Sequence, residues 1–97
     1  MAQLNETIHQ SVRLRIMASL ISLEPGDEVD FTYLRDLLEV TDGNLGAHLR
    51  KLADAGYIVI NKTFVERKPR SFISATAEGR RVFQEHVSAL ESILKSK

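Results

Sequence analysis

The first quarter of the chain has the hydrophobic period of an amphipathic helix. Its apolar residues recur at spacings of three and four, as Ile8, Val12, Ile16, Leu20 and Leu23. This pattern predicts a helix over residues 5–23, with Asn5 as its N-cap. Pro25 and Gly26 favour a turn directly after it, because proline restricts the preceding residue and a Pro-Gly pair is typical of turns.

Two helical patterns separated by a short turn occupy the middle of the chain. Val29 and Phe31 alternate with polar neighbours, which predicts a very short strand before the first of them. Thr32 is expected to cap the first helix, which must end by Val40. The apolar side of that helix consists of Leu34, Leu37 and Leu38.

The second of these helices follows residues 41–44, Thr-Asp-Gly-Asn, which favour a turn and supply cap oxygens. Its apolar positions repeat at helical spacing, as Leu45, Leu49, Leu52 and Ala53. Gly56 is expected to end it as the residue after the C-cap. Two helices separated by three or four residues are the sequence form of a helix-turn-helix.

The period changes after Gly56, where β-branched and aromatic residues predict two strands. The first strand covers residues 57–60 and 63–65, and the second covers residues 71–75. Residues 66–70 between them, Glu-Arg-Lys-Pro-Arg, form a charged loop whose proline suits a hairpin tip better than a sheet interior. Two strands joined by a basic loop predict a wing.

A last helix over residues 77–95 is expected to have Thr76 as its N-cap and Glu78 at the positive end of its dipole. It carries two apolar stripes. One contains Phe83, Val87, Leu90 and Leu94, and its neighbour contains Val82, His86, Ala89 and Ile93. We expect the second stripe to close the core and the first to form a homodimer interface. Alternatively, the first stripe only completes the core of its own chain.

Length and composition limit the number of domains and the class of protein. A chain of 97 residues predicts one domain, residues 1–97, without a second effector or catalytic domain. Hydrophobic residues make up 43% and charged residues 27%, the mixture of a globular protein. A domain this short buries only about 60 to 65% of its unfolded surface, so a dimer interface would add stability. The absence of cysteine excludes disulfides and thiolate zinc sites.

Membrane insertion is not expected. The longest apolar stretch, residues 16–23, is far shorter than the roughly 20 residues that a bilayer span requires, and no targeting signal opens the chain. We therefore expect a cytoplasmic protein without a membrane partner.

The net charge is zero, because 13 Lys and Arg residues balance 13 Asp and Glu residues. Taken alone, this argues against a nucleic-acid partner. Residues 1–41 contain three basic and seven acidic residues, a net charge of −4, whereas residues 42–81 contain eight basic and four acidic residues, a net charge of +4. The positive half includes the third predicted helix and the wing. Such a dipolar arrangement can orient a protein toward phosphates.

Four segments carry a family resemblance. They are IHQSVRLRIM at residues 8–17, TDGNLGAHLRKL at residues 41–52, AGYI at residues 55–58 and SATAEGR at residues 74–80. In this order they resemble the winged helix-turn-helix of small MarR-like and ArsR-like transcriptional regulators. The resemblance implies a mainly α fold with a small β-hairpin, in the order helix, strand, helix, helix, strand, wing, strand, helix. It also implies a homodimeric regulator that binds double-stranded DNA sequence-specifically, with the third helix in the major groove and the wing on the backbone or in the minor groove.

The candidate DNA contacts lie on the third helix and the wing. They are Thr41, Asn44, Ala47, His48, Arg50 and Lys51 on the helix, and Arg67, Lys68 and Arg70 on the wing. Asparagine pairs with adenine, whereas basic side chains reach bases or phosphates. The alternatives are a solvated helix face and a solvated hairpin tip. A second hypothesis is a winged-helix protein-interaction module without DNA binding, motivated by the zero net charge and by the small residues Gly46 and Ala47.

The sequence contains no motif that is typical of catalysis, of cofactor binding or of a metal site. It has no cysteine nucleophile, no phosphate-binding glycine loop and no serine in an esterase-like elbow, so we expect neither an enzyme nor a cofactor. The acidic residues of segment 24–30 lack the spacing of a calcium-binding EF-hand. His9, His48 and His86 fall on three different predicted helices. A metal- or ligand-responsive site at His9 and His86 would require the first and last helices to approach each other.

Overall fold

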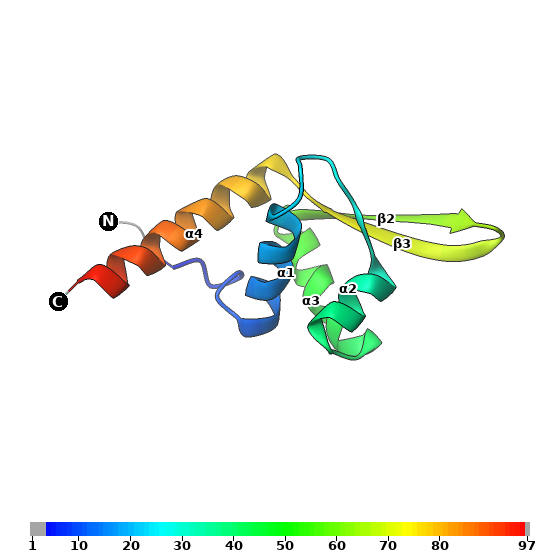
Figure 1. The fold of residues 1–97 in the computed structure, drawn as a ribbon, viewed down its shortest axis with the longest axis horizontal. Coiled ribbons are helices and arrows are strands. Elements are labelled where there is room, and N and C mark those ends of the chain that lie inside the picture. Colours follow the sequence, from blue (N-terminus) through cyan, green and yellow to red (C-terminus); the bar gives the residue numbers. More distant parts are fainter. Residues whose placement is uncertain (1–3, 97) are drawn as a thin grey trace.

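The computed structural model describes residues 4–96. The elements of this part follow the order α1 (Ser11–Ile21), β1 (Val29–Asp30), α2 (Phe31–Leu38), α3 (Asp42–Asp54), β2 (Ile58–Val65), β3 (Lys68–Ala75) and α4 (Ala77–Lys95). Figure 1 shows α1, α2 and α3 grouped as a body, with the β2–β3 hairpin extending to one side and α4 to the other. The molecule is elongated, with extents of 55 × 25 × 21 Å. The predicted fold class, a winged helix-turn-helix, is confirmed.

The start of α1 differs from the sequence prediction. The helix begins at Ser11, and its N-cap is Gln10, not Asn5. Asn5 caps only a single turn that precedes the helix. The reason is tertiary: the main-chain N–H of Asn5 donates a hydrogen bond to His86 Nδ1 of α4 at 3.0 Å. The segment before α1 therefore follows the surface of α4 and not the axis of α1.

The cap of α2 also differs. Asp30 precedes the helix with an extended backbone, and its carboxylate accepts a hydrogen bond from the Tyr33 N–H at 3.2 Å. The prediction of Thr32 as the cap was wrong, because Thr32 lies within the first turn of the helix. An aspartate at the end of β1 is already placed to satisfy the free N–H groups of that turn.

The turn of the helix-turn-helix consists of three residues, Glu39, Val40 and Thr41. Glu39 has a left-handed backbone, with φ 56°. The Val40 N–H donates to the carbonyl of Arg35 and the Glu39 N–H to the carbonyl of Asp36, both at 3.3 Å, which is a Schellman motif. Thr41, one of the four residues 41–44 expected to supply cap oxygens, then caps α3, whereas the other three lie within the first turn of the helix. The local hydrogen bonds of this turn therefore fix how α3 leaves α2.

The three strands form an antiparallel sheet in the order β1-β3-β2. Only Glu66 and Arg67 connect β2 to β3, so the predicted charged loop at residues 66–70 was wrong. Both residues have positive φ, 51° and 67°, as a type I′ hairpin turn requires. Pro69 fits within β3 because it pairs with Phe64, the second pair from the turn. In a two-residue hairpin the backbone N–H at that position points away from the partner strand.

The core lies between the three helices of the body and the base of the hairpin. Its fully buried apolar side chains include Ile8, Ile16, Met17, Leu20, Leu34, Leu45, Leu49, Leu52 and Ile73. Ile58 and Ile73 bring the base of the sheet into this core, whereas every residue of segment 61–70 is exposed. The distal half of the hairpin is therefore free to contact another molecule.

The start of α4 packs closely against the corner between α3 and β2. The Thr76 N–H donates to the carbonyl of Tyr57 at 3.0 Å, and the Thr76 hydroxyl donates to the carbonyl of Gly56 at 2.7 Å. Gly79 lies in the first turn of α4, where a Cβ would overlap the carbonyl oxygen of Tyr57. Thr76 caps the helix as predicted. Gly79 is required by this close approach and not by its backbone conformation.

The core-facing stripe of α4 is shorter than predicted. Val82, His86 and Ala89 are buried, but Ile93 is 56% exposed. The prediction that Ile93 closes the core was wrong, because α4 runs outward beyond the body in Figure 1. Within residues 4–96, no helix combines the length and apolar character needed to cross a bilayer.

His86 connects α4 to the segment before α1. Its side chain is buried, and its Nδ1 accepts the hydrogen bond from Asn5, so its ring proton lies on Nε2. Nε2 lies 3.3 Å from Nδ1 of His9, which belongs to the turn before α1 and not to a helix. Burial, followed by the neighbouring His9, lowers the pKa of His86 below its ordinary value of 6.5. A neutral His86 therefore holds the two segments together.

We expect the free energy of unfolding to decrease as the pH falls below about 6.5. Below that value His86 takes up a proton more readily in the unfolded chain than in the folded one, so acid favours unfolding. His48 acts in the same direction, because its pKa is also lowered in the fold. Thermal melts between about pH 8 and about pH 5 measure the effect. A His86→Gln variant should show a weaker pH dependence, and an unchanged profile would contradict this assignment.

Candidate nucleic-acid interface

α3 presents a polar face to solvent, opposite its buried leucines Leu45, Leu49 and Leu52. The exposed residues of this face include Gly43, Asn44, Ala47, Arg50 and Lys51. Thr41 precedes them, and its hydroxyl accepts a hydrogen bond from the Asn44 N–H at 3.1 Å. The candidates predicted on this helix are thus exposed together, except His48.

His48 lies at the edge of this face and turns toward α1. It is half-buried, and its Nδ1 accepts a hydrogen bond from Nη1 of Arg13 at 3.1 Å. Burial, followed by the positive charges of Arg13 and Lys51, lowers the pKa of His48. The ring is therefore neutral at neutral pH. It can donate one hydrogen bond through Nε2 but contributes no positive charge.

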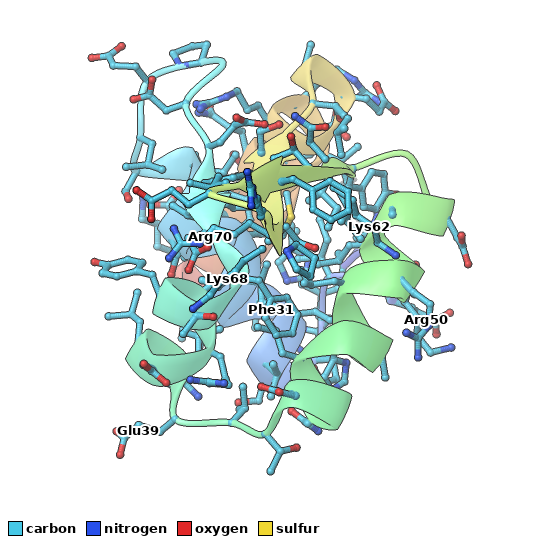
Figure 2. The ribbon with its side chains drawn as sticks, turned by 90° about the vertical axis from the view of Figure 1, so that its right-hand side faces the viewer. Phe31, Glu39, Arg50, Lys62, Lys68 and Arg70 are labelled. Atoms are coloured by element: carbon cyan, nitrogen blue, oxygen red, sulfur yellow. The ribbon has the colours of Figure 1, made fainter. Side chains whose placement is uncertain are left out.

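A cleft of about 250 Å³ separates α3 from the hairpin. Its lining consists of Phe31, Gly46, Leu49, Arg50, Ile60, Lys62 and Ser71. Arg50 comes from α3 and Lys62 from β2, and Figure 2 shows both side chains on the α3 side of the hairpin. Two positive charges from separate elements therefore border one opening.

Lys62 is a site residue that the sequence prediction missed. Ile58 and Ile60 turn toward the core, so period-two alternation places Lys62 next on the same face of β2. The prediction did not use this signal, because it divided the strand at residues 61–62. The structure has one continuous strand there.

The predicted wing cations do not form one group. Side chains along a strand alternate between the two faces of a sheet. The pairing of β2 with β3 places Lys68 and Arg70 on the face opposite Lys62. Arg70 Nη1 lies 3.8 Å from Oδ1 of Asp30, and Figure 2 shows Lys68 and Arg70 on the α2 side. Arg67 lies in the turn itself. The hairpin thus presents positive charge on both faces and at its tip.

Two glycines on the exposed side of α3 have no packing role. A Cβ at Gly43 would meet nothing within 4 Å, and a Cβ at Gly46 would meet only Nη1 of Arg50, at 3.6 Å. Neither glycine has a positive φ. Glycine costs about 1 kcal/mol relative to alanine in a helix interior. This part of α3 therefore keeps a bare surface at the expense of helix stability, and a bare surface allows close approach of a ligand.

The stripe predicted to form a dimer interface is partly used by its own core. Phe83 packs against the core and Leu90 is half-buried, whereas Val87 is 36% and Leu94 is 80% exposed. A cleft of about 330 Å³ beside the stripe is lined by Ile21, Phe83, Gln84, Val87, Ser88 and Glu91. Together with the exposed Ile93, these residues give the outer part of α4 an apolar surface.

The approach of His9 to His86 has the geometry of a hydrogen bond between two rings. Across residues 4–96, no group of three or more histidine, aspartate or glutamate residues is arranged to hold a metal ion. The two histidines therefore have a structural explanation that requires no ligand.

Comparison with known proteins links this geometry to a family. Residues 12–94 match the family model described as a winged helix DNA-binding domain. An uncharacterized protein of Methanocaldococcus jannaschii is 33% identical over 85 residues, which cover 88% of this chain and 89% of that protein. The structure of a transcriptional regulator homologue from Pyrococcus horikoshii is 27% identical, with a TM-score of 0.83 over 93% of this chain and 86% of that chain. A MarR-family transcriptional regulator structure from Enterococcus faecalis is 24% identical, with a TM-score of 0.70 over 92% and 74% of the two chains.

These similarities cover nearly all of the described chain, including α3 and the hairpin. The predicted resemblance to small winged helix-turn-helix regulators is confirmed, in a family and fold that are typically not enzymatic, and the Enterococcus faecalis structure shares this fold. The chain belongs to the winged helix DNA-binding domain family and is a small DNA-binding regulator.

Proposed function

We propose that this chain regulates transcription by binding double-stranded DNA sequence-specifically as a homodimer. In this proposal α3 occupies the major groove, and the hairpin follows the backbone or enters the minor groove. The observation that supports it best is the cleft between α3 and the hairpin, bordered by Arg50 and Lys62. A DNA strand whose phosphates pass this opening would meet cations from both α3 and the hairpin. On one side of that strand α3 would lie in the major groove, and on the other side the hairpin would lie along the backbone or in the minor groove.

We assign base recognition to the first half of α3. The amide of Asn44 can pair with adenine, and the methyl group of Ala47 can contact the methyl group of thymine. Gly43 and Gly46 would let the helix backbone come close to the base edges. Phosphate or base contacts are assigned to Thr41, His48, Arg50, Lys51, Lys62, Arg67, Lys68 and Arg70.

The homodimer is assigned to α4. Its outward surface carries Val87 and Leu94, with Phe83 and Leu90 beside them. Two such helices can bury each other's apolar surface around a twofold axis. The two copies of α3 would then contact half-sites about 34 Å apart, so the preferred DNA sequence should be close to a palindrome.

Selection of bound duplexes from a random pool, followed by a salt titration on the selected sequence, tests this function. We expect a near-palindromic site, two copies of the chain on each duplex by sedimentation, and binding that weakens steeply with salt. A pool without an enriched sequence would contradict sequence-specific binding. An enriched asymmetric site occupied by one copy would contradict the homodimer.

A protein-interaction module without DNA binding is the second candidate function. The observation that favours it is an apolar surface on α2, where Tyr33 is 60% and Leu37 is 50% exposed. A single stoichiometric protein partner, together with no duplex binding at low salt, would establish this function in place of the first. Neither candidate involves catalysis.

A further inference from the structure

An exposed phenylalanine lies near the tip of the hairpin. Phe64 of β2 is 73% exposed, and its cross-strand partner in β3 is Pro69. This pair adds nothing to the core, which contains only the base of the hairpin. Large apolar side chains that gather on an exposed projection mark binding surfaces. The pair is therefore a candidate contact with another molecule, separate from the cations of the hairpin.

Phe64 lies on the face of the sheet that leads into the cleft beside α3. The pleat places Ile60, Lys62 and Phe64 on one face, and the first two line the cleft together with Arg50. Phe64 is four residues beyond Ile60, roughly 13 Å along a strand. Half a turn of B-DNA is about 17 Å. A duplex with α3 in its major groove would therefore present its next minor groove near Phe64.

The charges around Phe64 indicate which partner fits this surface. The hairpin carries four cations, Lys62, Arg67, Lys68 and Arg70, and one acidic residue, Glu66. Lys62 shares the face of the apolar pair, and Arg67 lies in the turn beside it. Lys68 and Arg70 lie on the opposite face. An apolar pair with positive charge beside it is complementary to a polyanion with exposed apolar faces. DNA fits both properties, because its phosphates flank stacked bases.

The hairpin turn next to this pair is conformationally strained. Glu66 and Arg67 have φ values of 51° and 67°, which residues other than glycine rarely adopt. An Asn-Gly turn would have the same shape without this strain. Strained residues cluster at ligand-binding sites, where their position matters more than their conformational cost. The turn places Arg67 at the end of the hairpin, beside the apolar pair.

We propose that Phe64, supported by Pro69, is an apolar wedge that enters the minor groove and partly unstacks one base step, so that the bound duplex bends. Lys62 and Arg67 bind the phosphates on either side of this step. Pyrimidine–purine steps unstack most easily, so the wedge selects such a step without a hydrogen bond to a base. The inference rests on the proposed function, because it specifies how the wing binds the same duplex.

The test uses the duplex selected from the random pool, with 2-aminopurine placed in turn at the steps half a helical turn from each half-site and with dyes at both ends. The wild-type chain is expected to raise the 2-aminopurine emission at one step and to shorten the distance between the dyes. Phe64→Ala should abolish the emission increase, reduce the bend and weaken binding about tenfold. The matched control is Val59→Ala, which removes an exposed apolar side chain at the base of the same strand and should behave as wild type.

The outcomes separate the wedge from the proposed function. Wild-type binding without a bend or an emission change overturns the wedge and leaves the DNA-binding regulator intact. Failure of the wild type to bind any duplex overturns both. A Phe64→Ala variant that binds and bends DNA as wild type, but changes the oligomeric state in sedimentation, overturns the wedge and identifies Phe64 as a protein contact. Thermal melting of the variant should match wild type closely, because the ring lies outside the core.

Discussion

Replacement of Gly79 by alanine is expected to lower the free energy of unfolding by about 3 kcal/mol. The new Cβ would overlap the carbonyl oxygen of Tyr57, a backbone atom that cannot rotate away. α4 would have to move from the corner and would lose the hydrogen bonds between Thr76 and the backbone of Gly56 and Tyr57. Urea denaturation at a fixed protein concentration, followed by circular dichroism, measures the change.

Gly43→Ala and Gly46→Ala are the matched controls for this prediction. The same methyl group at these positions meets open space or the end of the flexible Arg50 side chain. Gly46→Ala should therefore raise the free energy of unfolding by up to about 1 kcal/mol, because alanine is the better helix former in a helix interior. Gly43→Ala, at the second residue of α3, should raise it by less. Equal destabilisation by all three substitutions would show that the joint between α4 and the corner is not the cause. Weaker DNA binding by the two stabilised variants would support a close approach of α3 to the bases.

Removal of both cations at the cleft, Arg50→Ala with Lys62→Ala, is expected to weaken binding to the selected duplex about 100-fold. A plot of the logarithm of the binding constant against the logarithm of the salt concentration should also have a slope that is less steep by about two, because two phosphate contacts are lost. Fluorescence anisotropy over a series of salt concentrations measures both effects.

The control is Arg81→Ala with Lys95→Ala, which removes the same charge from α4. Arg81 is exposed and forms ion pairs with Glu78 and Glu85, each at 2.6 Å, so it is already neutralised locally. Binding by this control should remain close to wild type. If both double variants weaken binding equally, net charge determines affinity, and the cleft has no special role.

The local features of the fold could be predicted from the sequence because short-range chemistry decides them. Thr41 and Thr76 each supply an oxygen to N–H groups a few residues away, and Gly56 has the positive φ, 84°, that a residue after a helix often needs. Hydrophobic period predicted the helices, and β-branched and aromatic composition predicted the strands of the hairpin. These signals were enough to predict the correct order of elements. They were also enough to place the candidate DNA contacts on α3 and the wing.

The errors occurred where a distant partner competes with local preference. Asn5 has the chemistry of an N-cap, but its main-chain N–H bonds to His86, 81 residues later. Pro69 is typical of a turn, but pairing with β2 keeps it inside β3. Ile93 continues the apolar stripe of α4, yet it is 56% exposed, because α4 runs outward beyond the body in Figure 1. In each case the local sequence pattern was present, but contacts with distant parts of the chain, or the outward course of α4, changed the structure that it formed.

The type and order of the elements, the helix-turn-helix and the concentration of positive charge in residues 42–81 follow from local sequence patterns. Packing between separate elements is what makes Arg50 and Lys62 border one cleft, turns Lys68 and Arg70 away from it, and leaves no room for a side chain at Gly79. The two groups of features differ in the range of the interactions that produce them. Caps, turns and hydrophobic period depend on neighbours within about one helical turn, whereas a cleft or a close packing contact depends on how separate elements meet across the core.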